Sequence, residues 1–571
     1  MSFIFPALPF RNYIFVLILF LFLGTIVYWN SLTVSFHYDD YLTILKNPEI
    51  KGLKNFSKEF SFTKTSRPFL MLTFAVNYEL GRLNVLGYHL VNLILHILTS
   101  FILYLILVKT APSGQGSKII LIASSFVFLV HPLTTESVTY ISSRSSILSA
   151  FFYLLGVFIF IKANSTKKVT HLYTILFLIS YLLTMGSKES SITFPALIFV
   201  YDYYFLSEGK FKKVKKNLLP FYLPLLLITF LLIIIKFNYA FSLKSPDNTI
   251  RDLPSHIFSE VYTSVYYLKQ FFIPINLNID PDFRIISSFF DMQFVLSFVV
   301  FMTLLWISKK LYHSSRIISF SILWFFVTLS PHYLIRLQDI MNERWLYLPL
   351  AALSFFVAGT GLGIQALNKK YLVKASLLLA SLAIIFFSAD TIKRNYIYRS
   401  ELSLWMDTAE KSPYKARPHM NLGVMYDQKE FYDEAEKEYL KAIELKKDYY
   451  EAFQNLGTIY VRKKEYDKAL EALIKAITLK PDYAQAYNNL GVLYASKGDY
   501  KKAETEFLKA ISLDKNYSDV YVNLGNLYAD KREIEKAISF YQKAILSNPD
   551  LLNRKEVERL IIKYKILNSK S

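Results

Sequence analysis

The stretch NLGTIYVRKKEYDKALEALIKAITLKPDYAQAYNNLG, from Asn455 to Gly491, begins and ends with the same Asn-Leu-Gly triplet, 34 residues apart (455 to 489). The triplet recurs at this interval in both directions, so that the copies begin at Asn421, Asn455, Asn489 and Asn523. Tyrosines and alanines keep the same interval: Tyr426, Tyr460, Tyr494 and Tyr528; Ala435, Ala469, Ala503 and Ala537; Ala442, Ala476, Ala510 and Ala544. A period of this length predicts a helical repeat array.

The period and its small residues resemble the tetratricopeptide (TPR) repeat, a helix-turn-helix unit. Gly423 and its equivalents, with the alanines, are expected where two helices approach closely, and Pro481 and Pro549 close two of the units. The resemblance implies an array that binds peptides or proteins. Leu551 to Lys570 has the pattern of a basic amphipathic helix that caps the last repeat.

The composition before the array is that of a membrane protein. The 571 residues are 53% hydrophobic and 17% aromatic, and the net charge is +20. In a membrane protein an excess of Lys and Arg usually reports orientation, so we do not infer nucleic-acid binding. The absence of Cys excludes disulfides, zinc fingers and thiol catalysis.

Apolar stretches long enough to cross a bilayer recur along the first 390 residues. We expect about eleven spans, near 13–33, 88–108, 118–133, 145–162, 171–187, 191–206, 217–236, 292–308, 316–331, 345–366 and 371–390. The segment 255–273 is interrupted by Tyr, Lys269 and Pro274, so we expect an interfacial helix there.

Positive charge sets the expected orientation. Alternate short loops are rich in lysine and should face the cytoplasm: Lys109 and Lys118; Lys162, Lys167 and Lys168; Lys210, Lys212, Lys213, Lys215 and Lys216; Lys309, Lys310 and Arg316; Lys369, Lys370 and Lys374. The first long loop also holds lysines, but long loops translocate largely regardless of charge. An odd number of spans then places the repeat array outside the cytoplasm.

This topology gathers unusual polar residues on the extracytoplasmic face. They are Asp39, Asp40, Arg67, His89, His131, Glu136, Arg144, Lys188, Glu189, Glu343 and Arg344. Ionisable groups at membrane depth are costly, so their concentration on one face indicates a site. The alternative is a solvated rim of charges at the ends of the spans.

The paired carboxylates Asp39 and Asp40 have a chemical use after a first span. A hydroxyl that attacks a sugar carbon needs a base within hydrogen-bond reach, and we assign that role to Asp39. Asp40 would position Asp39 or share a divalent metal with it. Arg144, Lys188 and Arg344 are candidates to bind the departing phosphate. The alternative for the acidic pair is a polar turn that caps a loop helix.

The same region resembles the transmembrane-and-TPR-repeat-containing (TMTC) family. The likeness is carried by Tyr38-Asp39-Asp40 with Asn47, Arg67-Pro68, Leu72-Thr73-Phe74, Gly87 to Asn92, His131-Pro132, Thr135 to Val138, Arg144, Ser187-Lys188-Glu189 and Glu343 to Tyr347. It implies a GT-C glycosyltransferase that uses lipid-phosphate sugars for protein O-mannosylation, with Asp39 and Asp40 as the family's acidic pair. The Lys-, Ile- and Asn-rich composition looks prokaryotic, so the carrier could be dolichyl phosphate or another polyprenyl phosphate, in the cytoplasmic membrane.

The predicted fold class is all-α, with a multispan GT-C-like domain over 1–392, a connector with a degenerate repeat over 393–415, four TPR repeats over 416–550 and a capping helix over 551–571. Asn421, Asn455, Asn489 and Asn523 would line a groove and bind the backbone of an acceptor peptide. The alternative is that each Asn side chain bonds a neighbouring helix.

Three functions compete at this point. The first is a membrane glycosyltransferase with a polyprenyl-phosphate sugar donor, an acceptor protein on the repeats and no cofactor beyond a divalent metal at Asp39 and Asp40. The second is a membrane-anchored repeat scaffold without catalysis. The third is a transporter, whose charges should lie mid-span. The polar groups near span ends favour the first.

The orientation can be tested with a reporter enzyme that works only outside the cytoplasm. Fused after Asn395, the reporter should be active, because the Lys-rich loops hold the alternate span ends inside. Fused after Lys310, it should be inactive. The reverse pattern would contradict the orientation.

Overall fold

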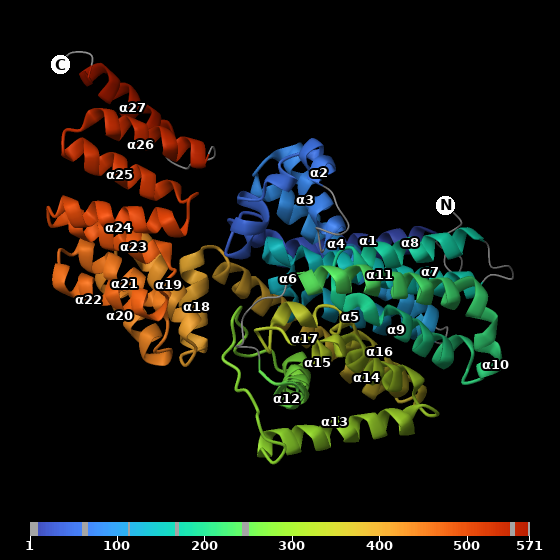
Figure 1. The fold of residues 1–571 in the computed structure, drawn as a ribbon. Helices are drawn as coiled ribbons and strands as arrows, with labels where there is room; N and C mark the ends of the chain where they lie inside the picture. The colour runs from blue at the N-terminus through green and yellow to red at the C-terminus, as the bar shows by residue number, and fades with distance from the viewer. Residues whose placement is uncertain are drawn as a thin grey trace. The chain divides into compact units, whose positions relative to one another are not determined.

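The computed structural model describes residues 10–59, 67–111, 115–165, 171–242, 251–548 and 554–568. Every regular element in this part of the chain is a helix, so the predicted all-α class is confirmed. The chain divides into two compact units, Met1–Leu404 and Trp405–Ser571 (Figure 1).

The first unit contains helices of very different lengths. The longer ones are α1 (Phe10–Tyr28), α3 (Pro68–Gly81), α4 (Val85–Thr110), α5 (Gln115–Val130), α7 (Arg144–Ser165), α8 (His171–Met185), α11 (Leu223–Ser242), α12 (Leu253–Phe272), α13 (Met292–Leu311), α14 (Arg316–Leu329), α16 (Ala351–Ala366) and α17 (Lys370–Ile397). The shorter α-helices are α2 (Leu53–Glu59), α6 (Thr135–Thr139), α9 (Phe194–Tyr201), α10 (Phe211–Val214) and α15 (Pro331–Leu334). Tight or wide helical turns, labelled η, complete the unit: η1 (Trp29–Ser31), η2 (Tyr41–Leu45), η3 (Pro48–Ile50), η4 (Pro132–Thr134), η5 (Ile141–Ser143), η6 (Glu189–Thr193), η7 (Asp202–Leu206), η8 (Lys215–Asn217), η9 (Leu218–Tyr222) and η10 (Glu343–Leu346).

The chain is a multi-pass membrane protein. Among the described residues, seven helices are long and apolar enough to cross a bilayer, over Asn12–Ser31, Val85–Thr110, Ile141–Ser165, Phe211–Ile235, Met292–Leu311, Arg316–Leu334 and Lys370–Ile397. A bent pair, Lys118–Val130 with Pro132–Thr139, would make an eighth, and His171–Met185 and Ala351–Ala366 are shorter apolar helices. The predicted span at 191–206 is broken into η6, α9 and η7.

Helix α12 differs from the candidate spans. It is seen nearly end-on in Figure 1, whereas α13 runs across the view. Its polar residues His256, Glu260 and Gln270 are buried inside the unit. Helix α12 is not among the described helices that are long and apolar enough to cross a bilayer, and the expected interfacial helix at 255–273 stays a prediction.

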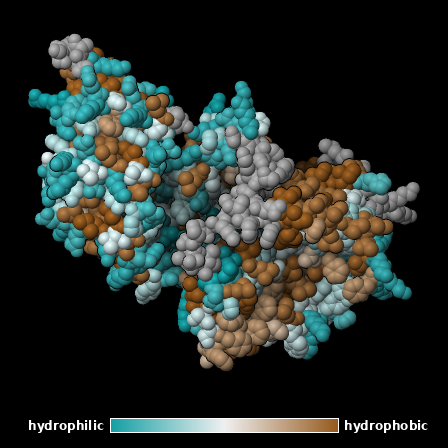
Figure 2. Space-filling model, in the orientation of Figure 1, coloured by the Kyte–Doolittle hydropathy of each residue, from teal (hydrophilic) through white to brown (hydrophobic). Residues whose placement is uncertain are grey.

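Apolar side chains cover much of the outer surface of this unit, seen as brown in Figure 2. Phe230 on α11 is 60% exposed and Leu296 on α13 is 59% exposed. Water would make such surfaces unfavourable, whereas a bilayer accepts them. The interior is also apolar and rich in aromatic rings, including Phe20, Tyr153 and Trp324.

The link between the units passes through α18 (Glu401–Lys411). Three residues separate the end of α17 at Ile397 from the start of α18 at Glu401, and the division between the units falls after Leu404. The predicted connector, 393–415, therefore contains the last turn of α17 and all of α18.

The second unit is built from helix pairs of the predicted period. The pairs are α19 (Ala416–Gln428) with α20 (Tyr432–Leu445), α21 (Tyr450–Arg462) with α22 (Tyr466–Leu479), α23 (Ala484–Ser496) with α24 (Tyr500–Leu513), and α25 (Ser518–Asp530) with α26 (Ile534–Ser547). A further helix, α27 (Arg554–Asn568), buries Val557 and Ile561 against the last pair.

The repeated glycine is required by the close approach of the two helices in a pair. A Cβ atom on Gly491 would lie 2.6 Å from the Phe507 ring, and one on Gly457 would lie 2.6 Å from Leu473 Cγ. Such distances are too short for any side chain, so the large residue of the second helix occupies the space that glycine leaves.

We expect Gly491→Ala to destabilise the third repeat by about 1–3 kcal/mol, because overpacking against Phe507 outweighs the better helix propensity of alanine. Hydrogen exchange of α23 and α24 amides in the full-length protein measures the change. Ser496→Ala, an exposed change on the same helix, should alter the exchange free energy by less than about 0.5 kcal/mol. Equal effects of the two changes would contradict the packing explanation.

Candidate active site

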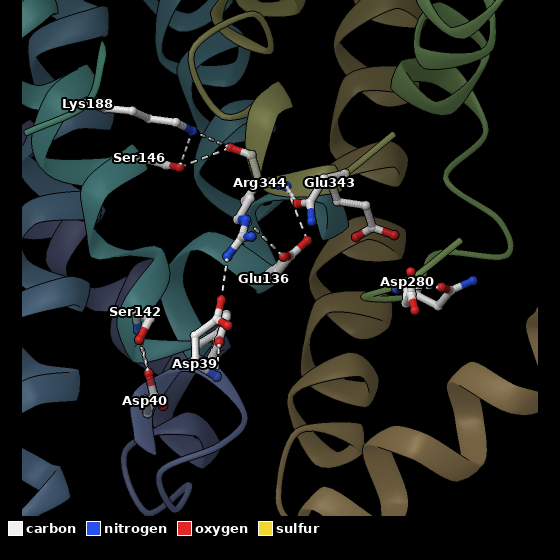
Figure 3. Close-up of polar contacts among 12 residues, drawn as sticks. Asp39, Asp40, Glu136, Ser142, Ser146, Lys188, Asp280, Glu343 and Arg344 are labelled. Carbon is white, nitrogen blue, oxygen red and sulfur yellow. Dashed lines mark hydrogen bonds and ion pairs between the residues drawn. The ribbon is translucent and has the colours of Figure 1, made fainter. Parts of the chain in front are cut away.

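The two adjacent carboxylates after the first span point in different directions. Asp39 and Asp40 immediately precede η2, and Tyr38 before them has a positive φ of 44°. In Figure 3 the Asp39 side chain points toward Arg344, whereas the Asp40 side chain points toward Ser142. The sharp turn at Tyr38 thus gives two neighbouring acids separate environments.

Asp40 is buried and holds the turn together. Its Oδ1 accepts hydrogen bonds from the backbone N–H of Ser142 (2.8 Å) and from the Ser142 hydroxyl, and its Oδ2 accepts one from the backbone N–H of His37 (3.0 Å). Burial raises the pKa of Asp40 to about 7, although these hydrogen bonds oppose the shift. The side chain therefore fastens the Asp39 turn to η5.

Asp39 presents its carboxylate to solvent and to a guanidinium. The side chain is 38% exposed, and Oδ2 lies 3.4 Å from Nη1 of Arg344. Its backbone N–H donates to the hydroxyl of Tyr140 (2.8 Å), and its carbonyl accepts from the Thr43 hydroxyl (2.8 Å). The backbone is thus fixed while the carboxylate stays accessible, which is the arrangement that a general base requires.

Arg344 links Asp39 to a second carboxylate. It lies on η10, and its backbone N–H donates to Oε2 of Glu136 (3.1 Å), while its Nε is 3.9 Å from Oε1 of the same residue. Glu136 is fully buried on α6, and Arg344 is 29% exposed. Figure 3 shows Arg344 between the two acids. The buried Glu136 therefore orients a cation that still reaches solvent.

Lys188 adds a second cation beside Arg344. Its Nζ donates to the Ser146 hydroxyl (2.8 Å) and approaches the Arg344 carbonyl (3.4 Å). Burial and the nearby Arg67 and Arg344 lower the pKa of Lys188 to about 7. Arg67 itself pairs with Glu189 at 3.1 Å. Because these positive charges repel one another, an anion bound beside them would be stabilised.

The other predicted site residues bind groups of the protein itself. His89 Nε2 contacts the Val34 carbonyl (2.8 Å), and His131 Nε2 contacts the Phe271 carbonyl (3.0 Å). Glu343 pairs with Arg394 at 2.8 Å. All three side chains are buried, so we leave them out of the proposed substrate contacts.

Arg144 is likewise enclosed. Its guanidinium donates to the side chains of Asn92 (2.7 Å) and Asn77 (2.6 Å) and to the Tyr88 carbonyl (3.0 Å). Its Cζ lies 4.6 Å from the centre of the Phe74 ring. A fully buried guanidinium with these partners holds α3, α4 and α7 together, and this geometry gives it no route to a phosphate.

The acidic pair does not fit a divalent metal. Both oxygens of Asp40 already accept hydrogen bonds from Ser142 and His37. In the described part of the chain, no group of three or more His, Cys, Asp or Glu side chains is arranged to hold a metal ion. We therefore derive no step through a metal at Asp39 and Asp40.

Several residues of the site were not predicted from the sequence. Tyr140, Ser142 and Ser146 contact the predicted groups, and Asp280, which is 3% exposed, lies beyond Glu343 in Figure 3. Hydroxyl residues are common at span ends and carry no pattern of their own. Asp280 follows α12 in an irregular loop, where no periodicity marks it.

Three of the four repeated asparagines contact the preceding repeat. Asn489 Nδ2 donates to the Thr458 hydroxyl (2.9 Å), and Asn523 Nδ2 donates to Asn488 Oδ1 (2.8 Å). Asn455 Nδ2 lies 3.9 Å from the Met420 sulfur, whereas Asn421 Nδ2 is buried without a hydrogen bond. These contacts favour the packing alternative, and acceptor binding by the four asparagines stays a prediction.

Comparisons with known proteins identify the array. A family model described as "TPR repeat" matches residues 457–498. Two models described as "Tetratricopeptide repeat" match residues 416–449 and 482–546. Two similar solved structures are TTC0263, a thermophilic TPR protein of Thermus thermophilus (20% identity, 30% of this chain, 92% of that chain, TM-score 0.27), and YrrB, a TPR protein (27% identity, 31% and 90%, TM-score 0.24).

The membrane unit and array together are similar to curated proteins. Protein O-mannosyl-transferase F38B6.6 of Caenorhabditis elegans is 27% identical over 454 residues, which cover 76% of this chain and 63% of that protein. Protein O-mannosyl-transferase TMTC3 is 25% identical in both mouse and human, over 74% of this chain and 50% of each relative. The chain thus spans between half and 63% of the length of these relatives. The resemblance to the TMTC protein O-mannosyltransferases therefore holds over about three quarters of this chain.

Proposed function

We propose that this protein is a membrane glycosyltransferase that moves a sugar from a polyprenyl-phosphate carrier to a Ser or Thr hydroxyl of a protein outside the cytoplasm. The observation that carries the proposal is the accessible Asp39 carboxylate facing Arg344, with Lys188 alongside. The names of the relatives favour mannose as the sugar. The array would hold the acceptor protein.

The reaction follows from these groups. Asp39 accepts the proton of the acceptor hydroxyl as its oxygen attacks C1 of the sugar. The bond between C1 and the phosphate oxygen breaks, and polyprenyl phosphate leaves with the electron pair. Arg344 and Lys188 stabilise the negative charge of the phosphate, Arg344 as a rigid fork and Lys188 as a point charge. Glu136 holds Arg344 in place throughout.

A lipid carrier is supported by an apolar groove in the membrane unit. The groove has a volume of about 550 Å³ and lies between α12, α13, α14 and α16. Leu268, Val300, Phe326 and Phe356 are among its lining residues, and Lys269 and Ser321 are the polar members of that lining. Such a groove suits a branched hydrocarbon chain much better than a soluble sugar nucleotide.

One of the helices that line the groove, α12, also bonds the segment that carries Arg344. The hydroxyl of Tyr267, on α12, donates to the Asn342 carbonyl (3.1 Å) and accepts a hydrogen bond from the Asn342 backbone N–H (2.9 Å). Asn342 Oδ1 in turn accepts from the backbone N–H of Arg344 (3.1 Å). A carrier chain in the groove would therefore lie against the helix that supports the phosphate-binding cations.

We expect Asp39→Asn to lower the turnover number about a hundredfold or more, because the amide cannot take up the hydroxyl proton. Asp40→Asn should also lower it, through loss of the bonds that hold the turn. Transfer from a radiolabelled polyprenyl-phosphate sugar to protein in purified membranes is the measurement. Glu49→Gln, in the same loop, is the matched control and should retain wild-type turnover. Normal transfer by the Asp39 variant would contradict the assignment of Asp39 as the base.

Filling the groove should change how the enzyme uses its donor. We expect Ser321→Leu to raise KM for a long-chain donor about tenfold, because the larger leucine side chain would displace part of the donor's hydrocarbon chain from the groove. KM for a donor with two isoprene units should stay unchanged, because so short a chain leaves the groove largely empty. Leu296→Phe, on the lipid-facing surface of α13, is the control. An equal rise in KM for both donors would exclude this groove.

A further inference from the structure

The turn that carries Asp39 is held by residues beyond the last candidate span. Tyr38, immediately before Asp39, donates its backbone N–H to Oε1 of Glu401 at 2.7 Å. His37 Nε2 contacts the Tyr398 carbonyl at 2.6 Å. Tyr398 and Glu401 therefore contact the turn although they lie 361 and 363 residues further along the chain than their partners.

The turn needs such a hold because its backbone is unfavourable. Tyr38 has a φ of 44°, in the left-handed region that a bulky residue rarely adopts. The side chain of Tyr38 is 39% exposed. The Glu401 carboxylate accepts a hydrogen bond from the Tyr38 N–H and so stabilises the orientation of the peptide unit between His37 and Tyr38.

Glu401 is itself firmly placed. It is the first residue of α18, where Ser400 and Ser403 form a reciprocal cap: the N–H of Ser403 donates to Ser400 Oγ (3.1 Å), and the N–H of Ser400 donates to Ser403 Oγ (3.2 Å). The Ser403 hydroxyl also donates to the Ile397 carbonyl (2.9 Å), which fixes α18 to the end of α17.

The end of α17 is in turn tied to the core of the first unit. Asn395 Nδ2 donates to the Val27 carbonyl (3.0 Å), and its Oδ1 accepts from the Thr139 hydroxyl (2.7 Å). Arg394 reaches the Pro132 carbonyl (2.6 Å). Glu401 thus projects from a rigid support toward a strained turn.

We infer that Glu401 is a positioning residue, which holds the Tyr38 turn so that the Asp39 carboxylate faces Arg344. The inference rests on the proposed function, since its consequence is a faster chemical step. It also means that the helix leading into the repeat array begins with the residue that sets the geometry of the base. Misplacement of a base by about 1 Å can cost up to a hundredfold in rate.

The test compares Glu401→Ala and Glu401→Gln in the full-length protein. The alanine variant loses the acceptor for the Tyr38 N–H, so kcat should fall about tenfold with KM for the lipid-linked donor unchanged. The glutamine variant retains an acceptor oxygen and should keep kcat within about twofold of wild type. Glu410→Ala, an exposed glutamate on the same helix, is the control.

Two further measurements separate positioning from a general loss of structure. Tyr38→Asn, introduced with Glu401→Ala, should restore part of kcat, because asparagine adopts the left-handed conformation readily. Hydrogen exchange of the peptide 36–42 should speed up in Glu401→Ala and remain near wild type in Glu401→Gln. This exchange is measured without substrate, so it reports on the hold that Glu401 exerts even if no sugar transfer is found.

The possible results have distinct meanings. Unchanged exchange of peptide 36–42 in Glu401→Ala, or equal losses of kcat in the alanine and glutamine variants, would overturn the inference. Absence of transfer by the wild-type protein from every lipid-linked sugar tested would instead overturn the proposed function. Faster exchange with a selective loss of kcat, rescued by Tyr38→Asn, is the result that we expect.

Discussion

A buried ion pair supports the end of the membrane unit that carries the candidate site. Arg394 of α17 and Glu343 of η10 lie 2.8 Å apart with side chains 5% and 1% exposed, and Arg394 also donates to the Pro132 carbonyl beside α6. Removing either partner would leave an uncompensated buried charge, at a cost of about 3–5 kcal/mol. Because Glu343 precedes Arg344, this pair sets where the exposed guanidinium can reach.

Around this support, neighbouring residues divide structural and chemical tasks. Asp40 and Glu343 are buried and bond the protein, whereas Asp39 and Arg344, next to them in sequence, reach solvent and each other. The alternation follows from the turn at Tyr38, with its positive φ of 44°, and from the tight turn η10, which contains Glu343 and Arg344. One residue of each pair anchors the turn, and the other remains available to substrate.

Several elements of the site could be predicted from the sequence, but their roles could not. Asp39, Lys188 and Arg344 are unusual charges at span ends, and membrane cost alone singles them out. The same criterion also selected Arg144, His89 and His131, which the structure encloses among their own hydrogen-bond partners. Charged residues that bond the protein interior and charged residues that contact substrate look alike in the sequence, because both kinds are kept away from lipid.

The sequence by itself determined the repeat array, the all-α class and the approximate position of the membrane helices, because a 34-residue period and long apolar runs are properties of local sequence. The tertiary structure alone decided that Asp39 meets Arg344, 305 residues away, and that Glu401 meets Tyr38. The sequence of a helix that is apolar on all sides does not show which helices it packs against. Small residues and hydrogen bonds between helices determine that packing. Long-range pairing therefore appears only when the whole unit is assembled.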